Sequence, residues 1–288
     1  MKKIGFIGLG NMGKGMSINL SKENLEIIGY DINDNAYKNL KDNKILIADN
    51  LNHLINESEI IITMLPDGKA VKKVWSEGIA FSTPGKYFID CSTIDVKTSK
   101  SVQIQAKEKG LLTLDAPVSG GVIGADQGTL TFMVGGTSKT YNEMKFLFEI
   151  MGKNSILCGE EGSGQSAKIC NNMLLASTMI AVGESFNLGK KLGLDLNKLF
   201  DVISTSTGSC WAVNSYCPIK GIGPNSPADN NYEGGFATAL MYKDLGLAVD
   251  AATETKSKIN YGIQTYQKYK QVTENNKGNL DFSNIINE

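Results

Sequence analysis

Short apolar runs recur through the first half of the chain, and several of the segments between them have the apolar spacing that is typical of helices. The runs cover residues 3–7, 25–30, 45–48, 59–65, 87–91, 111–115, 130–134 and 155–157. The helical segments include one that ends at residue 20 and others at 34–42, 68–75, 95–109 and 138–151. Strands that alternate with helices form largely parallel sheets, so this pattern predicts a doubly wound, Rossmann-type α/β domain.

The pattern changes at Gly162. From there to about Lys191 the chain has no proline and no clear turn, and an unbroken helix of that length spans roughly 45 Å. Apolar residues lie on nearly every side of it, which predicts a helix buried between two bodies. Further helices are expected at 196–204, 234–255 and 261–272. The predicted domains are a Rossmann domain (1–161), an interdomain helix (162–192) and an all-helical C-terminal domain (193–288).

A glycine-rich turn directly follows the first strand. Its sequence is Gly8-Leu9-Gly10-Asn11-Met12-Gly13. In the dinucleotide-binding motif the first glycine permits the tight turn, the second lets the backbone approach the pyrophosphate, and the third lets the helix pack on its strand. The second strand ends at Asp31, where a carboxylate can bind the adenosine ribose. We therefore predict NAD binding, although Asp31 could instead cap a helix that begins near Asp34.

Composition narrows the chemistry. The 288 residues carry 29 cationic and 30 anionic side chains, so neither nucleic acid nor an anionic membrane is the expected partner. All 29 cations are lysine. A bidentate arginine clamp on a substrate carboxylate or on the extra phosphate of NADP is therefore excluded. Backbone amides, hydroxyls, side-chain amides or lysine must hold any carboxylate.

The histidine and cysteine content predicts no metal site. His53 is the single histidine, and it lies in a polar segment with the composition of a surface helix. The five cysteines are scattered without the paired spacing of a zinc site, and we interpret them as reduced thiols. No leader segment and no apolar run of membrane-spanning length is evident, so we expect a cytoplasmic protein.

A lysine and an asparagine near the start of the long helix form a second candidate site. Ser163 is a plausible N-cap of that helix. Lys168 and Asn172 are four residues apart, so a helix presents both side chains on one face. Lysines are usually solvated, but the apolar neighbours of Lys168 are typical of buried positions. The local sequence leaves a functional and a purely structural role open.

With these motifs together, the chain resembles the 3-hydroxyisobutyrate dehydrogenase family of β-hydroxyacid dehydrogenases nearly from end to end. Four blocks carry the resemblance: residues 6–17, Asp115-Ala116-Pro117-Val118-Ser119-Gly120-Gly121, Gly162-Ser163-Gly164-Gln165 with Lys168 and Asn172, and Lys243-Asp244-Leu245. Cys210-Trp211, Tyr216-Cys217-Pro218 and the tract 226–236 look like the 3-hydroxyisobutyrate branch in particular. Ser209 and Val96 depart from the residues common in that branch, and Ser209 leaves the substrate range in doubt.

The resemblance implies an NAD-dependent oxidation of (S)-3-hydroxyisobutyrate to methylmalonate semialdehyde, a step of valine breakdown. The long apolar helix and the helical second domain leave room for an interface, so we expect a homodimer or homotetramer. The resemblance also implies that Lys168 is the catalytic acid/base and that Asn172 assists at the substrate. The segment Ser119, Gly120 and Gly121 would hold the substrate carboxylate. The dinucleotide motif predicts cofactor contacts from Gly8, Leu9, Gly10, Asn11, Met12, Gly13 and Asp31. The resemblance adds Leu65, Pro66, Thr93 and Lys243.

Two other functions remain open on sequence grounds. One is a reductase of the same family that acts on tartronate, glyoxylate or succinic semialdehyde. The other, from a different class, is a non-catalytic dinucleotide-binding sensor, since a fold alone does not guarantee chemistry.

Overall fold

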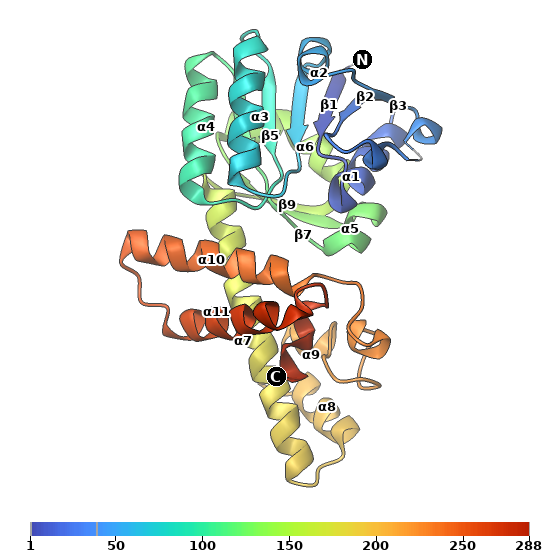
Figure 1. Cartoon of the computed structure of the whole chain (residues 1–288), viewed down its shortest axis with the longest axis vertical. Coiled ribbons are helices and arrows are strands. Elements are labelled where there is room, and N and C mark those ends of the chain that lie inside the picture. Colours follow the sequence, from blue (N-terminus) through green and yellow to red (C-terminus); the bar gives the residue numbers. More distant parts are fainter. Residues whose placement is uncertain (1, 39, 288) are drawn as a thin grey trace. The chain divides into compact units, whose positions relative to one another are not determined.

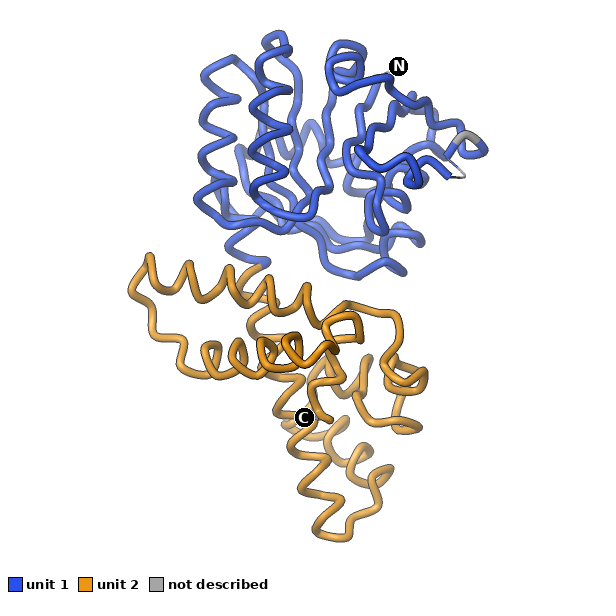
Figure 2. Tube along the Cα trace, viewed as in Figure 1, with its two compact units in different colours: residues 1–168 blue, residues 169–288 orange. Residues whose placement is uncertain are grey.

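The computed structural model describes residues 2–38 and 40–287, and the chain divides into two compact units, residues 1–168 and 169–288 (Figure 2). The division falls inside one long helix, α7 (Ser163–Lys191). That helix was predicted from the uninterrupted pattern after Gly162. The three-part domain boundaries drawn from the sequence stay a prediction.

The first unit is built on a nine-stranded sheet in the part of the chain that the structure describes (Figure 1). The strand order is β3-β2-β1-β4-β5-β6-β8-β7, and β9 pairs with β8. The first six strands run parallel, as predicted, whereas β8 is antiparallel to β6 and β7. The strands are β1 (Lys3–Ile7), β2 (Glu26–Tyr30), β3 (Ile45–Ile47), β4 (Ile60–Thr63), β5 (Tyr87–Asp90), β6 (Leu112–Asp115), β7 (Val118–Ser119), β8 (Leu130–Gly135) and β9 (Gly152–Gly159).

Helices cover both faces of this sheet. On one face, Phe6 of β1 belongs to the same apolar core as Met16 and Phe148, whereas Ile7, the next residue, belongs to a second core with Trp75 and Val102. Successive strand side chains point to opposite faces, so these two cores explain the uninterrupted apolar strands. The helices of this unit are α1 (Asn11–Lys22), α2 (Leu51–Glu57), α3 (Gly68–Phe81), α4 (Val96–Glu108), α5 (Gly121–Gln127) and α6 (Ser138–Met151).

The predicted helix 34–42 is wrong. The structure has two short 3₁₀ helices there, η1 (Asp34–Tyr37) and η2 (Lys41–Asn43), and residue 39 lies outside the described residues. The side chain of Asn33 accepts the N–H of Asn35, and asparagine and aspartate favour such local bonds over a continuous helix. The short elements β7 and α5 were not predicted either.

The second unit is helical, as predicted. It contains most of α7, then α8 (Leu196–Thr205), α9 (Trp211–Asn214), η3 (Pro227–Asn230), α10 (Thr238–Thr255), α11 (Asn260–Val272), η4 (Thr273–Lys277) and η5 (Phe282–Asn287). Its core joins Met179 and Phe186 of α7 to Leu245 of α10 and Tyr269 of α11. Among the described residues, no helix has the length and apolar character needed to cross a membrane.

Candidate active site

The candidate residues of the first unit follow the carboxyl ends of neighbouring parallel strands. The glycine turn follows β1, Asp31 follows β2, and the segments that contain Leu65 and Thr93 follow β4 and β5. Ser119 lies just beyond β6. Since β2, β1, β4, β5 and β6 are adjacent in that order, these ends share one edge of the sheet. Ligands of doubly wound folds bind at this edge.

Each of the three glycines of the turn is a glycine for a different structural reason. Gly8 has φ +92°, and its N–H donates to Tyr30 O at 2.9 Å. A Cβ on Gly13 would lie 1.9 Å from the backbone oxygen of Gly8, so the start of α1 packs against the turn itself. A Cβ on Gly10 would meet no protein atom within 4 Å. The fold therefore needs Gly8 and Gly13. Gly10 leaves open space beside the first N–H groups of α1, and the pyrophosphate contact there stays a prediction.

Asp31 is tied to the same turn. Its Oδ2 accepts the backbone N–H of Leu9 at 2.7 Å, and its Oδ1 accepts the N–H of Asn33 at 2.8 Å. The cap of η1 is Asn33, so Asp31 does not have the capping role that the sequence left open. The carboxylate is held in place and partly exposed, which suits a fixed acceptor for ribose hydroxyls.

The segments after β4 and β5 are joined by buried polar side chains that sequence reasoning missed. The Oγ of Ser92 accepts the N–H of Leu65 at 2.8 Å and donates to Asp90 Oδ1 at 2.6 Å. Gln165, at the start of α7, donates to Ser92 O at 2.7 Å and accepts the N–H of Ile94 at 3.1 Å. The position of Asp90 at the end of an apolar strand was the available signal for this network.

The Ser119–Gly121 segment is a sharp change of direction between β7 and α5. Gly120 has φ +134° and Gly121 has φ +63°, values that favour glycine. Gly120 is exposed and precedes the first residue of α5. Backbone N–H groups in such a segment can converge on an anion. The predicted role in binding a carboxylate stays a prediction.

Lys168 lies one turn into α7 and is 7% exposed, which is far from the exposure of a solvated surface lysine. Ser163 is the first residue of this helix rather than its cap. The N–H groups of Gly162 and Gln165 donate instead to the carboxylate of Asp115, which is a buried residue of β6. Sequence reasoning assigned no role to Asp115.

Asn172 and Lys243 belong to the second unit. The Nδ2 of Asn172 donates to Asp244 Oδ2 at 2.6 Å, and the Nζ of Lys243 lies 3.4 Å from Asp244 Oδ1. Both Asn172 and Asp244 are at most 3% exposed. Asp244 thus holds the amide of Asn172 and lies beside Lys243, so these two predicted residues share one partner. All the other predicted site residues, including Lys168, lie in the first unit.

Comparison with known proteins identifies the family of the chain. Residues 3–159 match the NAD-binding domain of 6-phosphogluconate dehydrogenase, and residues 162–288 match a domain described as NAD-binding of NADP-dependent 3-hydroxyisobutyrate dehydrogenase. The mitochondrial 3-hydroxyisobutyrate dehydrogenases of Drosophila melanogaster and Homo sapiens are 44% and 42% identical to this chain in alignments that cover 98% of its length. The matches cover 87% and 85% of those proteins.

The chain belongs to the 3-hydroxyisobutyrate dehydrogenase family. A solved structure of the Mycobacterium tuberculosis 3-hydroxyisobutyrate dehydrogenase with L-serine is 42% identical, covers 100% of this chain and 98% of its own, and gives a TM-score of 0.96. The Salmonella typhimurium 3-hydroxyisobutyrate dehydrogenase is 23% identical over the whole chain with a TM-score of 0.82, which shows the common fold. This member of the 3-hydroxyisobutyrate dehydrogenase family is therefore an NAD-dependent oxidoreductase that acts on an alcohol carbon.

Proposed function

We propose that this chain oxidises (S)-3-hydroxyisobutyrate to methylmalonate semialdehyde with NAD, a step of valine breakdown, and that Lys168 is its acid/base. The observation that carries the role of Lys168 is the burial of this lysine one turn into α7, in a chain whose motifs match the family throughout. When bound, NAD supplies the acceptor for the hydride of the alcohol carbon. The protein must then remove the hydroxyl proton and hold the substrate.

Lys168 takes up the hydroxyl proton in the oxidation. In the reverse direction its ammonium donates a proton to the aldehyde oxygen. A lysine can act as a base only in its neutral form. His53, the single histidine of the sequence, has no part in this proposal: it lies on α2, after the outermost strand β3, with its side chain 42% exposed.

The substrate carboxylate is held by the Ser119–Gly121 segment in this proposal. The chain has no arginine, so the backbone N–H groups of Gly120 and Gly121 and the hydroxyl of Ser119 replace an arginine clamp. Hydrogen bonds to a charged group contribute about 1.5 to 3 kcal/mol each. Asn172, four residues after Lys168, offers its amide to the substrate, and Asp244 fixes the direction of that amide.

In this proposal the cofactor contacts come from the turn Gly8–Gly13, Asp31, the segment with Leu65 and Pro66 after β4, Thr93 after β5, and Lys243. We propose NAD rather than NADP as the preferred form. The carboxylate of Asp31 is fixed by two backbone N–H groups, and it repels a phosphate on the adenosine ribose. No arginine is present to compensate for that repulsion.

Substitution of Lys168 tests the proposed chemistry. Lys168→Ala removes the proton acceptor, so we expect kcat to fall by about 10² to 10⁴. The Kd of NADH, measured by its fluorescence on titration with protein, should stay within about threefold because the turn after β1 is untouched. Lys191→Ala, an exposed lysine on the same helix, is the matched control and should keep full activity. Unchanged turnover in Lys168→Ala would rule out this role.

We further propose a cytoplasmic homodimer or homotetramer. The relatives from Drosophila melanogaster and Homo sapiens are mitochondrial by name, so cell fractionation decides the location.

The second unit exposes several large apolar side chains on and next to α7 and α8, and formation of the oligomer would bury them: Leu174, Leu188, Leu192, Leu194 and Val202. Light scattering that gives the mass of one chain would contradict the oligomer.

A further inference from the structure

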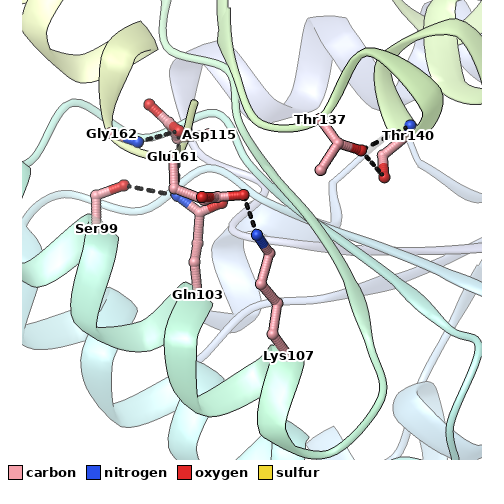
Figure 3. Close-up of polar contacts among 8 residues, drawn as sticks. All are labelled: Ser99, Gln103, Lys107, Asp115, Thr137, Thr140, Glu161 and Gly162. Carbon is pink, nitrogen blue, oxygen red and sulfur yellow. Dashed lines mark hydrogen bonds and ion pairs between the residues drawn. The ribbon is translucent and has the colours of Figure 1, made fainter. Parts of the chain in front are cut away.

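The first turn of α7 is held by a carboxylate that is distant in the sequence. Oδ1 of Asp115 accepts the N–H of Gly162 at 2.7 Å (Figure 3). Oδ2 accepts the N–H of Gln165 at 2.9 Å. The first N–H groups of a helix have no acceptor inside the helix. Asp115, at the end of β6, therefore caps α7 and fixes this helix directly to the sheet.

Asp115 is in turn fixed by α4. The Nε2 of Gln103 donates to Asp115 Oδ1 at 3.1 Å and to Ser99 Oγ at 3.2 Å. Figure 3 shows Ser99, Gln103 and Lys107 along one side of α4, with Lys107 paired to Glu161 just before α7. Asp115, Gln103 and Ser99 are at most 1% exposed, so water does not compete for these bonds.

Backbone packing leaves the start of α7 no room to shift. A Cβ on Gly164 would lie 2.3 Å from Met133 O, and a Cβ on Gly135 would lie 2.4 Å from Asp115 Oδ1. Both glycines let α7 approach the sheet closely. The carboxylate and these contacts together fix the first turn of α7 against β6 and β8.

Three segments with proposed site residues converge on this carboxylate. Gln165, whose N–H it accepts, also binds the backbone on both sides of Thr93. Lys168 follows Gln165 by three residues, which is about one helical turn. Ser119 follows Asp115 by four residues on the same strand connection.

An ordinary cap in the same unit shows the difference. Helix α6 is capped by the residue next to it, since Thr137 Oγ1 accepts the N–H of Thr140 at 3.1 Å (Figure 3). A local side chain of this kind stabilises a helix end without fixing the helix to a distant strand. Helix α6 carries no residue of the proposed site.

We propose that Asp115 is a positioning residue of the dehydrogenase reaction: it holds the Lys168 amine, the Thr93 segment and the Ser119–Gly121 segment in one geometry. This inference rests on the proposed function. Asp115 acts through Gln165 and the first turn of α7.

Asp115→Asn tests the inference because an amide cannot accept hydrogen bonds at both positions. In one orientation its NH₂ faces the N–H of Gln165. In the other it faces the N–H of Gly162 and the NH₂ of Gln103. We expect kcat to fall at least about tenfold, since a small misplacement of a reacting group is costly, while the KM for NAD stays within about threefold. An unchanged kcat would overturn the positioning role.

Thr137→Ala is the matched control for loss of stability. It removes the cap of α6, so the urea midpoint should fall while kcat stays within about twofold. Equal losses of kcat in the two variants at equal losses of stability would show that Asp115 is merely structural, and would overturn the inference.

Gln103→Met provides a second variant if Asp115→Asn does not fold. It removes one donor to Asp115 at similar side-chain volume, and we expect kcat to fall about threefold. In that case an unchanged kcat would overturn the inference.

The wild type and Lys168→Ala are measured in the same assay. An inactive wild type would overturn the proposed function and this inference together, whereas an active wild type, inactive Lys168→Ala and fully active Asp115→Asn would overturn only the inference.

Discussion

At the residue scale, Asp90 is a buried acid whose protonation affects stability. Its Oδ1 accepts the hydroxyls of Thr63 and Ser92 and the N–H of Ser92, while its buried Oδ2 has no hydrogen-bond partner among the described residues. Burial raises the pKa of this carboxyl to about 7, and the hydrogen bonds from Ser92 and Thr63 only partly oppose that effect. The nearby charge of Asp115 raises the pKa further.

Asp90 therefore makes the free energy of unfolding depend on pH. The folded chain keeps the proton up to about pH 7, whereas the unfolded chain loses it near its ordinary pKa of 3.8. Between these values the folded state binds more protons, so stability falls as pH rises, by about 1.4 kcal/mol for each pH unit. Above the folded pKa this loss is complete.

Asp90→Asn removes this dependence because the amide is neutral at every pH. Urea unfolding of both proteins between about pH 5 and pH 8 should show the variant gaining stability relative to the wild type up to about pH 7, with a constant difference beyond it. The other titrating groups are common to both proteins and cancel in the difference. A difference that does not change with pH would contradict the buried, protonated state of Asp90.

At the element scale, the turn between β1 and α1 separates what the fold needs from what the cofactor needs. A Cβ on Gly13 would overlap the backbone oxygen of Gly8, whereas a Cβ on Gly10 would meet no protein atom. Gly13→Ala should therefore lower the urea midpoint and weaken NADH binding together. Gly10→Ala should leave the midpoint nearly unchanged, because its φ of −67° suits alanine, but weaken NADH binding at least about tenfold.

Calorimetric titration with NADH and urea unfolding of the two variants give the comparison. The turn is a binding element only if Gly10→Ala weakens NADH binding without lowering the urea midpoint. NADH affinity equal to that of the wild type in Gly10→Ala would mean that the pyrophosphate does not pass this residue.

Sequence patterns predicted most of the elements that position the site. The apolar strands, the glycine turn and the unbroken helix after Gly162 have local signals that tertiary packing confirms. The segment 34–42 was misread because side-chain bonds of Asn33 compete with a helix. The cap of α7 could not be predicted, since Asp115 is 47 residues from Gly162 and only the folded sheet brings them together.

At the scale of the whole molecule, the chain forms two compact units, and 3-hydroxyisobutyrate dehydrogenases match almost its entire length. The family match identifies the enzyme class, while the preferred 3-hydroxy acid stays a prediction. Asp31 and the absence of arginine set the expected coenzyme. The substrate and the coenzyme can therefore be tested together on the intact protein.

The most direct measurement is the initial rate of NADH formation by the purified protein with a panel of 3-hydroxy acids, repeated with NADP. We predict the highest kcat/KM for (S)-3-hydroxyisobutyrate, with NAD preferred over NADP at least about tenfold because Asp31 repels the extra phosphate. Absence of turnover with every 3-hydroxy acid, or a clear preference for NADP with a semialdehyde as substrate, would contradict the account.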